Sequence, residues 1–233
     1  MSFWAFVAIL AILGVMFGAL YISKIADTRQ KEEQQKRKHI RDLRNDLLDI
    51  DEIINTLFIY DRNPELISTL SRKMMSLIQE GLKLLPGDEQ LLRDLSDIQQ
   101  IESRVEALLA EPQEPEIPTS DRQIYILKKH FVKTIRFIRE LQSVGEINEL
   151  EASQHKSRLM KNALLLEVKA YRNHGEDARQ RGEISSAANY LKHAKELLIN
   201  SDLTFADKTD QIKAVSREIS GLYVTMPDHP EKK

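Results

Sequence analysis

The chain contains no cysteine and is poor in glycine and proline. Its 233 residues include only 8 glycines and 7 prolines, and 34 lysines and arginines nearly balance 36 aspartates and glutamates. Without cysteine, the protein can form no disulfide, no thiolate zinc site and no cysteine nucleophile. A net charge of −2 gives no overall electrostatic attraction to nucleic acid. Because helix breakers are few and apolar residues recur in helical steps, we expect an all-α protein.

Motifs that would mark an enzyme or a metal site are also missing. There is no HExxH, no P-loop and no GxGxxG. No two of the six histidines are three or four residues apart, so no helix would present two imidazoles to a metal. The sequence therefore predicts a protein that is not an enzyme, with no catalytic residue, no cofactor and no metal. Nucleic acid is not an expected partner, because we find no nucleic-acid-binding motif and expect no exposed aromatics among the basic residues.

One uncharged run stands at the start of the chain. Residues 3–22, FWAFVAILAILGVMFGALYI, form a stretch of about 20 residues, which as a helix crosses the ~30 Å hydrocarbon core of a bilayer. No basic residue precedes this run and no convincing cleavage site follows it, which favours an anchor at residues 1–23 over a cleaved signal peptide. Lysines and arginines follow the run and none precedes it, so we expect a cytoplasmic C-terminal body on a bacterial inner membrane.

Two features belong to the anchor and its flank. Gly14 and Gly18 have the small-xxx-small spacing through which membrane helices pack closely, although lipid-facing glycines would give the same pattern. Residues 24–39 are charged and almost without apolar side chains, so we expect a helical stalk that stands in water. The basic residues 36–38 either contact anionic lipid or only flank the anchor as a topology signal.

From residue 40 the pattern becomes amphipathic. Apolar residues follow the 3-4 spacing of a coiled-coil seam, and Leu48, Ile53 and Phe58 widen it, as suits a helix buried among several neighbours. The seam is Ile40, Leu43, Leu47, Ile50, Ile54 and Leu57. Asn63 and Pro64 predict the start of a second helix, and a turn at residues 86–88 precedes a third helix that ends near residue 110. We therefore predict an antiparallel helical bundle over residues 40–110, whose seam either closes the bundle or joins several chains.

A linker and a basic helix follow. Residues 111–119, EPQEPEIPT, contain three prolines and predict an acidic, extended boundary between two helical modules. The second module, residues 120–223, opens with Ser120 as the N-cap of a helix that reaches about residue 143. This helix has a basic face that suits anionic lipid, an acidic partner or plain solvation. The face consists of Arg122, Lys129, Lys133 and Arg136.

The second module carries a family resemblance at residues 168–201. Tyr171 is followed four residues later by Gly175, Gly182 stands at the expected turn, and small residues recur in the helix after it. This stretch resembles a tetratricopeptide unit, a thirty-four-residue helix-turn-helix. It departs from the family pattern at Ile199, where proline is usual, and at Ala178, where an aromatic is common. A capping helix is expected at about residues 204–223 and a disordered tail at residues 224–233.

The resemblance implies a surface for protein partners without catalytic chemistry of its own. Tetratricopeptide domains hold a peptide or a helix in a concave groove, and Arg172, Asn173 and Arg179 are the polar residues of the unit's first helix that would line it. The same residues also suit a solvated helix face. Two functions remain open: a membrane-anchored adaptor that binds a protein partner, and a self-assembling or accessory subunit of a larger membrane complex. A periplasmic body would follow only if the positive-inside rule failed.

Overall fold

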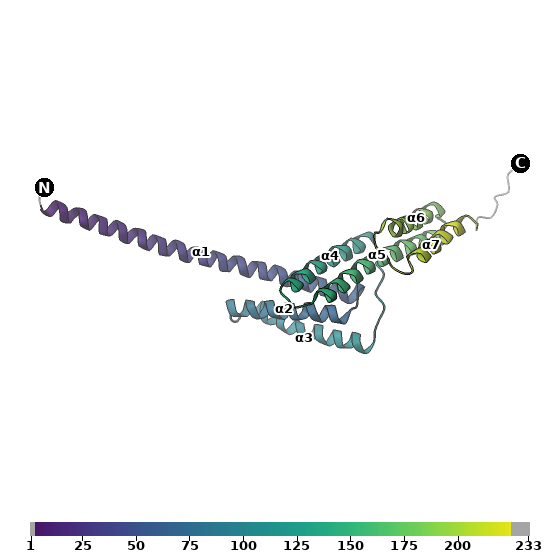
Figure 1. Ribbon diagram of the computed structural model, residues 1–233, viewed down its shortest axis with the longest axis horizontal. Coiled ribbons are helices and arrows are strands. Elements are labelled where there is room, and N and C mark those ends of the chain that lie inside the picture. Colours follow the sequence, from purple (N-terminus) through teal and green to yellow (C-terminus); the bar gives the residue numbers. More distant parts are fainter. Residues whose placement is uncertain (1–2, 225–233) are drawn as a thin grey trace. The chain divides into compact units, whose positions relative to one another are not determined.

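In a computed structural model, which describes residues 3–224, all regular structure is helical (Figure 1). Within the first helix, side chains are described at residue 24 and from residue 29 onward. The helices of this described part are α1 (Phe3–Tyr60), α2 (Pro64–Leu84), α3 (Glu89–Ala110), α4 (Asp121–Ser143), α5 (Glu149–Gln180), α6 (Ile184–Asn200) and α7 (Lys208–Val224). The all-α prediction is confirmed for this part of the chain. By contacts the chain divides into two compact units, Met1–Asp49 with Lys73–Ile98, and Ile50–Arg72 with Gln99–Lys233.

The predicted stalk, residues 24–39, lies in the middle of α1. The described side chains between residues 29 and 39 are exposed on all sides of the helix, as expected for a segment with no apolar face. Within the described part of the chain, no helix is both long and apolar enough to span a membrane. The side chains of the predicted anchor, Gly14 and Gly18 included, lie outside the described ones, as do residues 225–233 of the predicted tail.

In the first unit, α1, α2 and α3 meet at a glycine. A Cβ on Gly81 of α2 would stand 2.8 Å from Leu91 Cδ1 of α3 and 3.3 Å from Leu43 Cδ2 of α1, so the three helices pack closely at this point. Side chains also connect these elements near the surface. His39 Nε2 of α1 lies 2.9 Å from Glu80 Oε1 of α2, and Arg44 Nη2 donates to Oδ2 of Asp88, the residue before α3, at 2.6 Å.

The predicted seam on α1 is filled within one chain. Every seam residue from Leu43 to Leu57 is buried, and Ile40 is half-buried. Of the three residues that we expected to widen the seam, Ile53 and Phe58 are buried, but Leu48 is 65% exposed. Its side chain lies one position away from Leu47, about 100° round the helix, and so faces away from the neighbours that bury Leu47.

The helix boundaries follow from local hydrogen bonds. Asn63 Oδ1 accepts from the Leu66 N–H at 2.8 Å, and Ser120 Oγ accepts from the Gln123 N–H at 3.3 Å, so both predicted N-caps are confirmed. Residues 111–119 form neither helix nor strand. Their backbone is held to the end of α1, where the Glu116 N–H donates to the Ile59 carbonyl at 3.0 Å.

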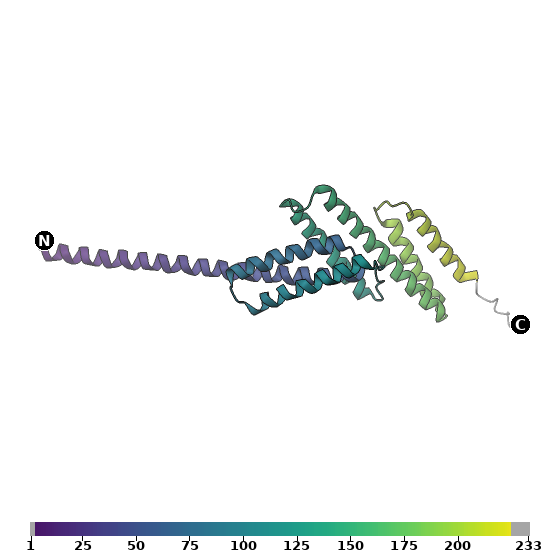
Figure 2. The ribbon, with the colours of Figure 1, turned by 90° about the horizontal axis from the view of Figure 1, so that it is seen from below.

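The second unit is built around α5. This helix packs against α4 and α6, and α6 packs against α7; Figure 2 shows α5, α6 and α7 following one another as helical hairpins. Its apolar core includes Leu164, Val168, Ala178, Ala187, Ala188, Leu191, Ala194, Leu198, Val215 and Leu222. The capping helix begins at Lys208 rather than near residue 204. Lys208 Nζ donates to the carbonyls of Ser201 and Leu203, which ties the start of α7 to the loop before it.

Candidate functional site

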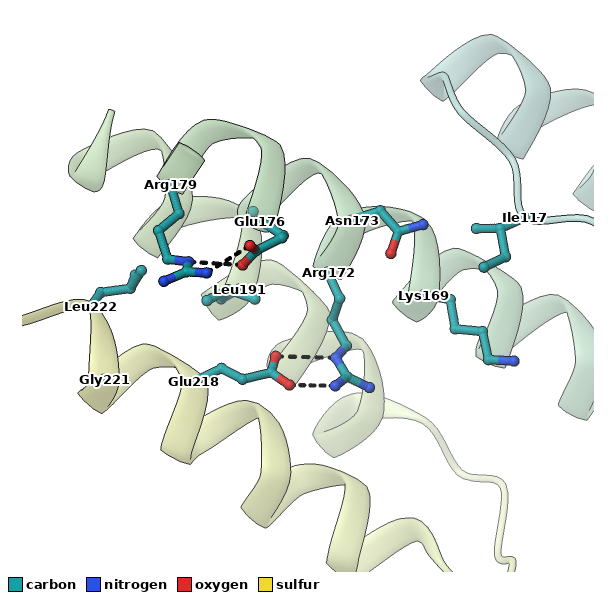
Figure 3. A pocket seen from close by; sticks show the side chains of 11 residues that line it. Ile117, Lys169, Arg172, Asn173, Glu176, Arg179, Leu191, Glu218, Gly221 and Leu222 are labelled. Carbon is teal, nitrogen blue, oxygen red and sulfur yellow. Dashed lines mark hydrogen bonds and ion pairs between the residues drawn. The ribbon is translucent and has the colours of Figure 1, made fainter. Parts of the chain in front are cut away.

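A cavity of about 690 Å³ lies between α5 and α7 (Figure 3). Such a volume is within the range of binding pockets in proteins. Residues of α5 line one side, α7 lines the other, and Leu191 of α6 and Ile117 from the extended segment complete the lining. The polar and charged residues of the lining are Lys169, Arg172, Asn173, Glu176, Arg179 and Glu218. The cavity and its lining are called the α5–α7 groove.

The helical period brings these polar residues of α5 together. Positions 172 and 173 each lie three or four residues from 169 and from 176, and 179 lies three residues beyond 176, so these side chains share one face of the helix. Gly175 borders this face, lines the groove and packs close to α6. A Cβ at Gly175 would stand 2.9 Å from Leu191 Cγ and 3.4 Å from the Ala187 carbonyl oxygen.

Two ion pairs define the polar surface of the groove. Arg172 of α5 reaches across to Glu218 of α7, with Nε donating to Oε2 at 3.1 Å and Nη2 donating to Oε1 (Figure 3). Arg179 makes a bidentate pair with Glu176 on its own helix, at 2.8 and 2.7 Å. The two groove carboxylates are therefore each held by an arginine.

Glu176 shows the electrostatic effect of this arrangement. Hydrogen bonds from Arg179 and from Gln180, with the Arg179 charge beside them, lower its pKa to about 2. The same pair raises the pKa of the Arg179 guanidinium. Both side chains are therefore charged at neutral pH, and a ligand in the groove meets fixed charges.

Lys169 and Asn173 are the remaining polar donors of α5 in the groove. Both side chains are exposed, and within the described part of the chain neither takes part in a hydrogen bond or an ion pair. The lining thus contains three cations, Lys169, Arg172 and Arg179, against two carboxylates. The groove offers an ammonium and an amide to a ligand that carries hydrogen-bond acceptors.

The predicted partner-binding residues all line this groove. Sequence reasoning placed Arg172, Asn173 and Arg179 together but missed Lys169 and Glu218. A helical wheel that starts at Arg172 finds Lys169, three residues earlier on the same face. No sequence pattern marks Glu218, because its pairing depends on how α7 packs beside α5.

The predicted basic face lies elsewhere, on the outer surface of α4. Arg122, Lys129 and Arg136 are exposed and Lys133 is partly exposed, and Arg136 Nε lies 3.5 Å from Glu140 Oε1. The expectation of no exposed aromatic among these basic residues is wrong. Tyr125 is 68% exposed on the same helix, because the face that α4 buries contains Ile124, Leu127 and Phe131.

Other polar residues of the second unit stabilise its packing. Asp61 at the end of α1 is buried and accepts from Arg158 Nη2 at 3.0 Å and from Asn162 Nδ2 at 2.8 Å, both on α5. Tyr171 donates to Asp121 Oδ1 at 3.1 Å; burial and this carboxylate raise its pKa to about 12. Among the described residues, no three histidine, aspartate or glutamate side chains come together as a metal site would require.

Comparison with known protein families, with curated proteins and with solved structures finds no match to this chain.

Proposed function

We propose that the chain is a single-pass, membrane-anchored scaffold, with its body in the cytoplasm, that binds a protein partner in the α5–α7 groove. The observation that supports this most is the groove itself. Residues that the tetratricopeptide resemblance assigns to partner binding, Arg172, Asn173 and Arg179, line one cavity of about 690 Å³. A scattered placement of these residues over a convex surface would have argued against the proposal.

The chemistry of the groove suits a polar, extended segment of a protein. The exposed donors Lys169 and Asn173 stand four residues apart on α5, about 6 Å along the helix axis at 1.5 Å per residue. Backbone carbonyls of an extended peptide, spaced about 3.3 Å per residue, place an acceptor opposite each donor. Carboxylates of the peptide would add favourable interactions with the excess positive charge of the lining.

The burial of the seam favours this proposal over self-assembly through a coiled coil. Leu43, Leu47 and Ile54 are already covered within one chain. A seam that joined several chains would leave these side chains in water in the single chain, at a cost of about 1.5–3 kcal/mol for each large apolar residue.

The test uses the full-length protein, purified in mild detergent after crosslinking in cells, with co-purifying proteins identified and their stoichiometry measured by mass spectrometry. Asn173→Trp fills the groove from an exposed position, and Lys169→Glu reverses the charge of a free donor. Lys192→Glu and Lys192→Trp on α6 are matched controls, because Lys192 is exposed and outside the groove.

We expect one dominant partner that both groove variants lose and both control variants keep. Equal recovery of the partner from all four variants would rule out the groove as the binding site. Recovery of the chain alone, as a discrete oligomer whose size depends on protein concentration, would support the self-assembling subunit instead. A reporter fused to the C-terminus tests the orientation separately.

A further inference from the structure

A second groove lies over the middle of α5, between α4 and α6. The cavity has a volume of about 500 Å³, and most of its lining is apolar. Phe131, Val132 and Ile135 come from α4, and Leu197 comes from α6. Helix α5 forms the floor, because it packs against both neighbouring helices.

The floor of this groove presents one apolar stripe of α5. Met160 lies three and four residues before Ala163 and Leu164, and Glu167 lies four and three residues after them, so the four share one face of α5. The apolar members are Met160, Ala163 and Leu164, and Glu167 ends the stripe. From Met160 to Glu167 this face is about 10 Å long at 1.5 Å per residue, which matches about two turns of a bound helix.

Large apolar side chains remain in water at this groove. Val132 is 68% exposed and Met160 is 40% exposed. Single exposed apolar residues are common on protein surfaces, but these two line the same concave, apolar cavity. Covering them removes apolar area from water, which is the main favourable term in association.

The two sides of the groove differ in charge. Within it, Lys128 of α4 is already held by Glu167 of α5, with Nζ donating at 2.8 and 3.0 Å. Along α4 it adjoins a cavity of about 620 Å³ whose lining includes Lys129 and Lys133, and the two cavities share Lys128, Val132 and Glu167. Along α6 and the loop after it, Glu196 and Asp202 form the edge. A ligand that fits both edges has acidic groups toward α4 and basic or neutral groups toward α6.

We propose that this α4–α6 groove binds an amphipathic helix of a partner protein, with apolar residues toward α5 and acidic residues along the flank that faces α4. A helix in such a groove anchors through residues at spacings of three, four and seven. This site differs from the α5–α7 groove, and the proposal does not rest on the function proposed above.

The basic face of α4 by itself would also suit anionic lipid, but the packing of α4 favours a protein. A helix that binds the surface of a bilayer inserts its apolar face among the acyl chains. In α4 that face, with Leu127 and Phe131, is buried in the protein core. The apolar side chains that remain available, Val132 and Met160, lie in a concave groove that a flat bilayer surface cannot follow.

Site-specific photocrosslinking on the full-length protein in cells tests this proposal. The photoreactive residue p-benzoylphenylalanine replaces Met160 in the groove, and in a control chain it replaces Leu150, an exposed residue of α5 outside the groove. Crosslinked peptides are sequenced by mass spectrometry. The double variant Lys129→Glu/Lys133→Glu is compared with Lys192→Glu/Lys213→Glu, a double reversal of the same sign at exposed residues outside both grooves. Circular dichroism verifies that each variant keeps its helical content.

We expect Met160, but not Leu150, to crosslink to one protein segment that has apolar residues at helical spacing and acids on one flank. The α4 double variant should reduce the crosslink by about tenfold or more, because like charges then face each other. Lysines in place of the partner's acidic residues should restore the crosslink, and Lys192→Glu/Lys213→Glu should leave it unchanged. Crosslinks only to lipid, only to segments without this pattern, or none at Met160 would overturn the proposal.

Discussion

The close approach of α5 and α6 at Gly175 gives a sharp prediction about stability. In Gly175→Ala, the new methyl group would lie 2.9 Å from Leu191 Cγ and 3.0 Å from Leu191 Cδ2, both inside van der Waals contact. The nearer atom is the branch carbon of the leucine, so relief requires the whole side chain to move. The Ala187 carbonyl oxygen at 3.4 Å belongs to the backbone of α6 and limits how far the two helices can separate without breaking contacts.

Two opposing effects decide whether Gly175→Ala raises or lowers the free energy of unfolding. Alanine in place of glycine within a helix stabilises by about 0.5–1 kcal/mol, because glycine loses more backbone entropy on folding. Forcing an extra methyl group into a packed contact costs about 1–3 kcal/mol. The second effect is larger at this site, so we expect Gly175→Ala to lower the free energy of unfolding by about 1 kcal/mol. In a body of this size that corresponds to a decrease in Tm of about 2–4 °C.

Gly221 provides the matched control. It lies within α7, and a Cβ there would meet nothing within 4 Å. Only the entropic effect remains, so Gly221→Ala should raise the free energy of unfolding by up to about 1 kcal/mol. Both variants, as full-length protein in mild detergent, are unfolded by heat and by urea and followed by circular dichroism at 222 nm. If Gly175→Ala stabilises as much as Gly221→Ala, α5 and α6 do not pack as closely as described.

Three further predictions concern polar side chains that are buried or partly buried in the second unit. Arg158→Ala leaves the buried Asp61 carboxylate without its arginine and should lower the free energy of unfolding by about 2–3 kcal/mol, less than for a fully buried pair because Arg158 is 29% exposed. Adding Asp61→Asn to this variant should recover part of the loss, as measured by urea unfolding. Burial and the Arg158 charge lower the pKa of His155, although neighbouring acids oppose this. Because the unfolded chain then binds the proton more strongly than the folded chain, the free energy of unfolding should fall as the pH drops below about 6.5. In urea unfolding at several pH values, His155→Leu should make this decrease smaller. Burial and Asp121 raise the pKa of Tyr171 to about 12, so stability should fall as the pH rises from about 10, and Tyr171→Phe should remove this contribution in alkaline unfolding curves.

Helix boundaries were predictable from the sequence because caps and turns are local. Asn63 and Ser120 accept hydrogen bonds from backbone N–H groups three residues ahead, so the sequence alone contains the interaction that starts each helix. The third helix was expected from about residue 89 to 110, and α3 has these bounds. The exposure of Leu48 was not predictable in this way. It depends on which neighbours α1 meets, and periodicity does not give the width of the buried face.

The part of the candidate site that lies on one helix was predictable, because it also depends only on local sequence. The helical period places Arg172, Asn173 and Arg179 on one face of α5 without knowledge of the fold. Glu218 is 46 residues from Arg172, and Asp61 is 97 residues from Arg158, so these pairs depend on the packing of separate helices. The sequence did not predict the α4–α6 groove. Its apolar residues come from three helices, and in each helix their spacing is the same as that of buried core residues.

The two grooves of the second unit would recognise the proposed partners by different physical means. In the α5–α7 groove, Arg172 and Arg179 already hold Glu218 and Glu176, so an acidic partner exchanges one ion pair for another and gains little net free energy from either arginine. We expect selectivity there to depend on Lys169, Asn173 and the shape of the groove. In the α4–α6 groove, the proposed helix would gain free energy from covering exposed apolar area, and the charged edges would set its orientation. A scaffold with both grooves would hold one partner through a weak, polar contact and another through an apolar contact that dissociates more slowly.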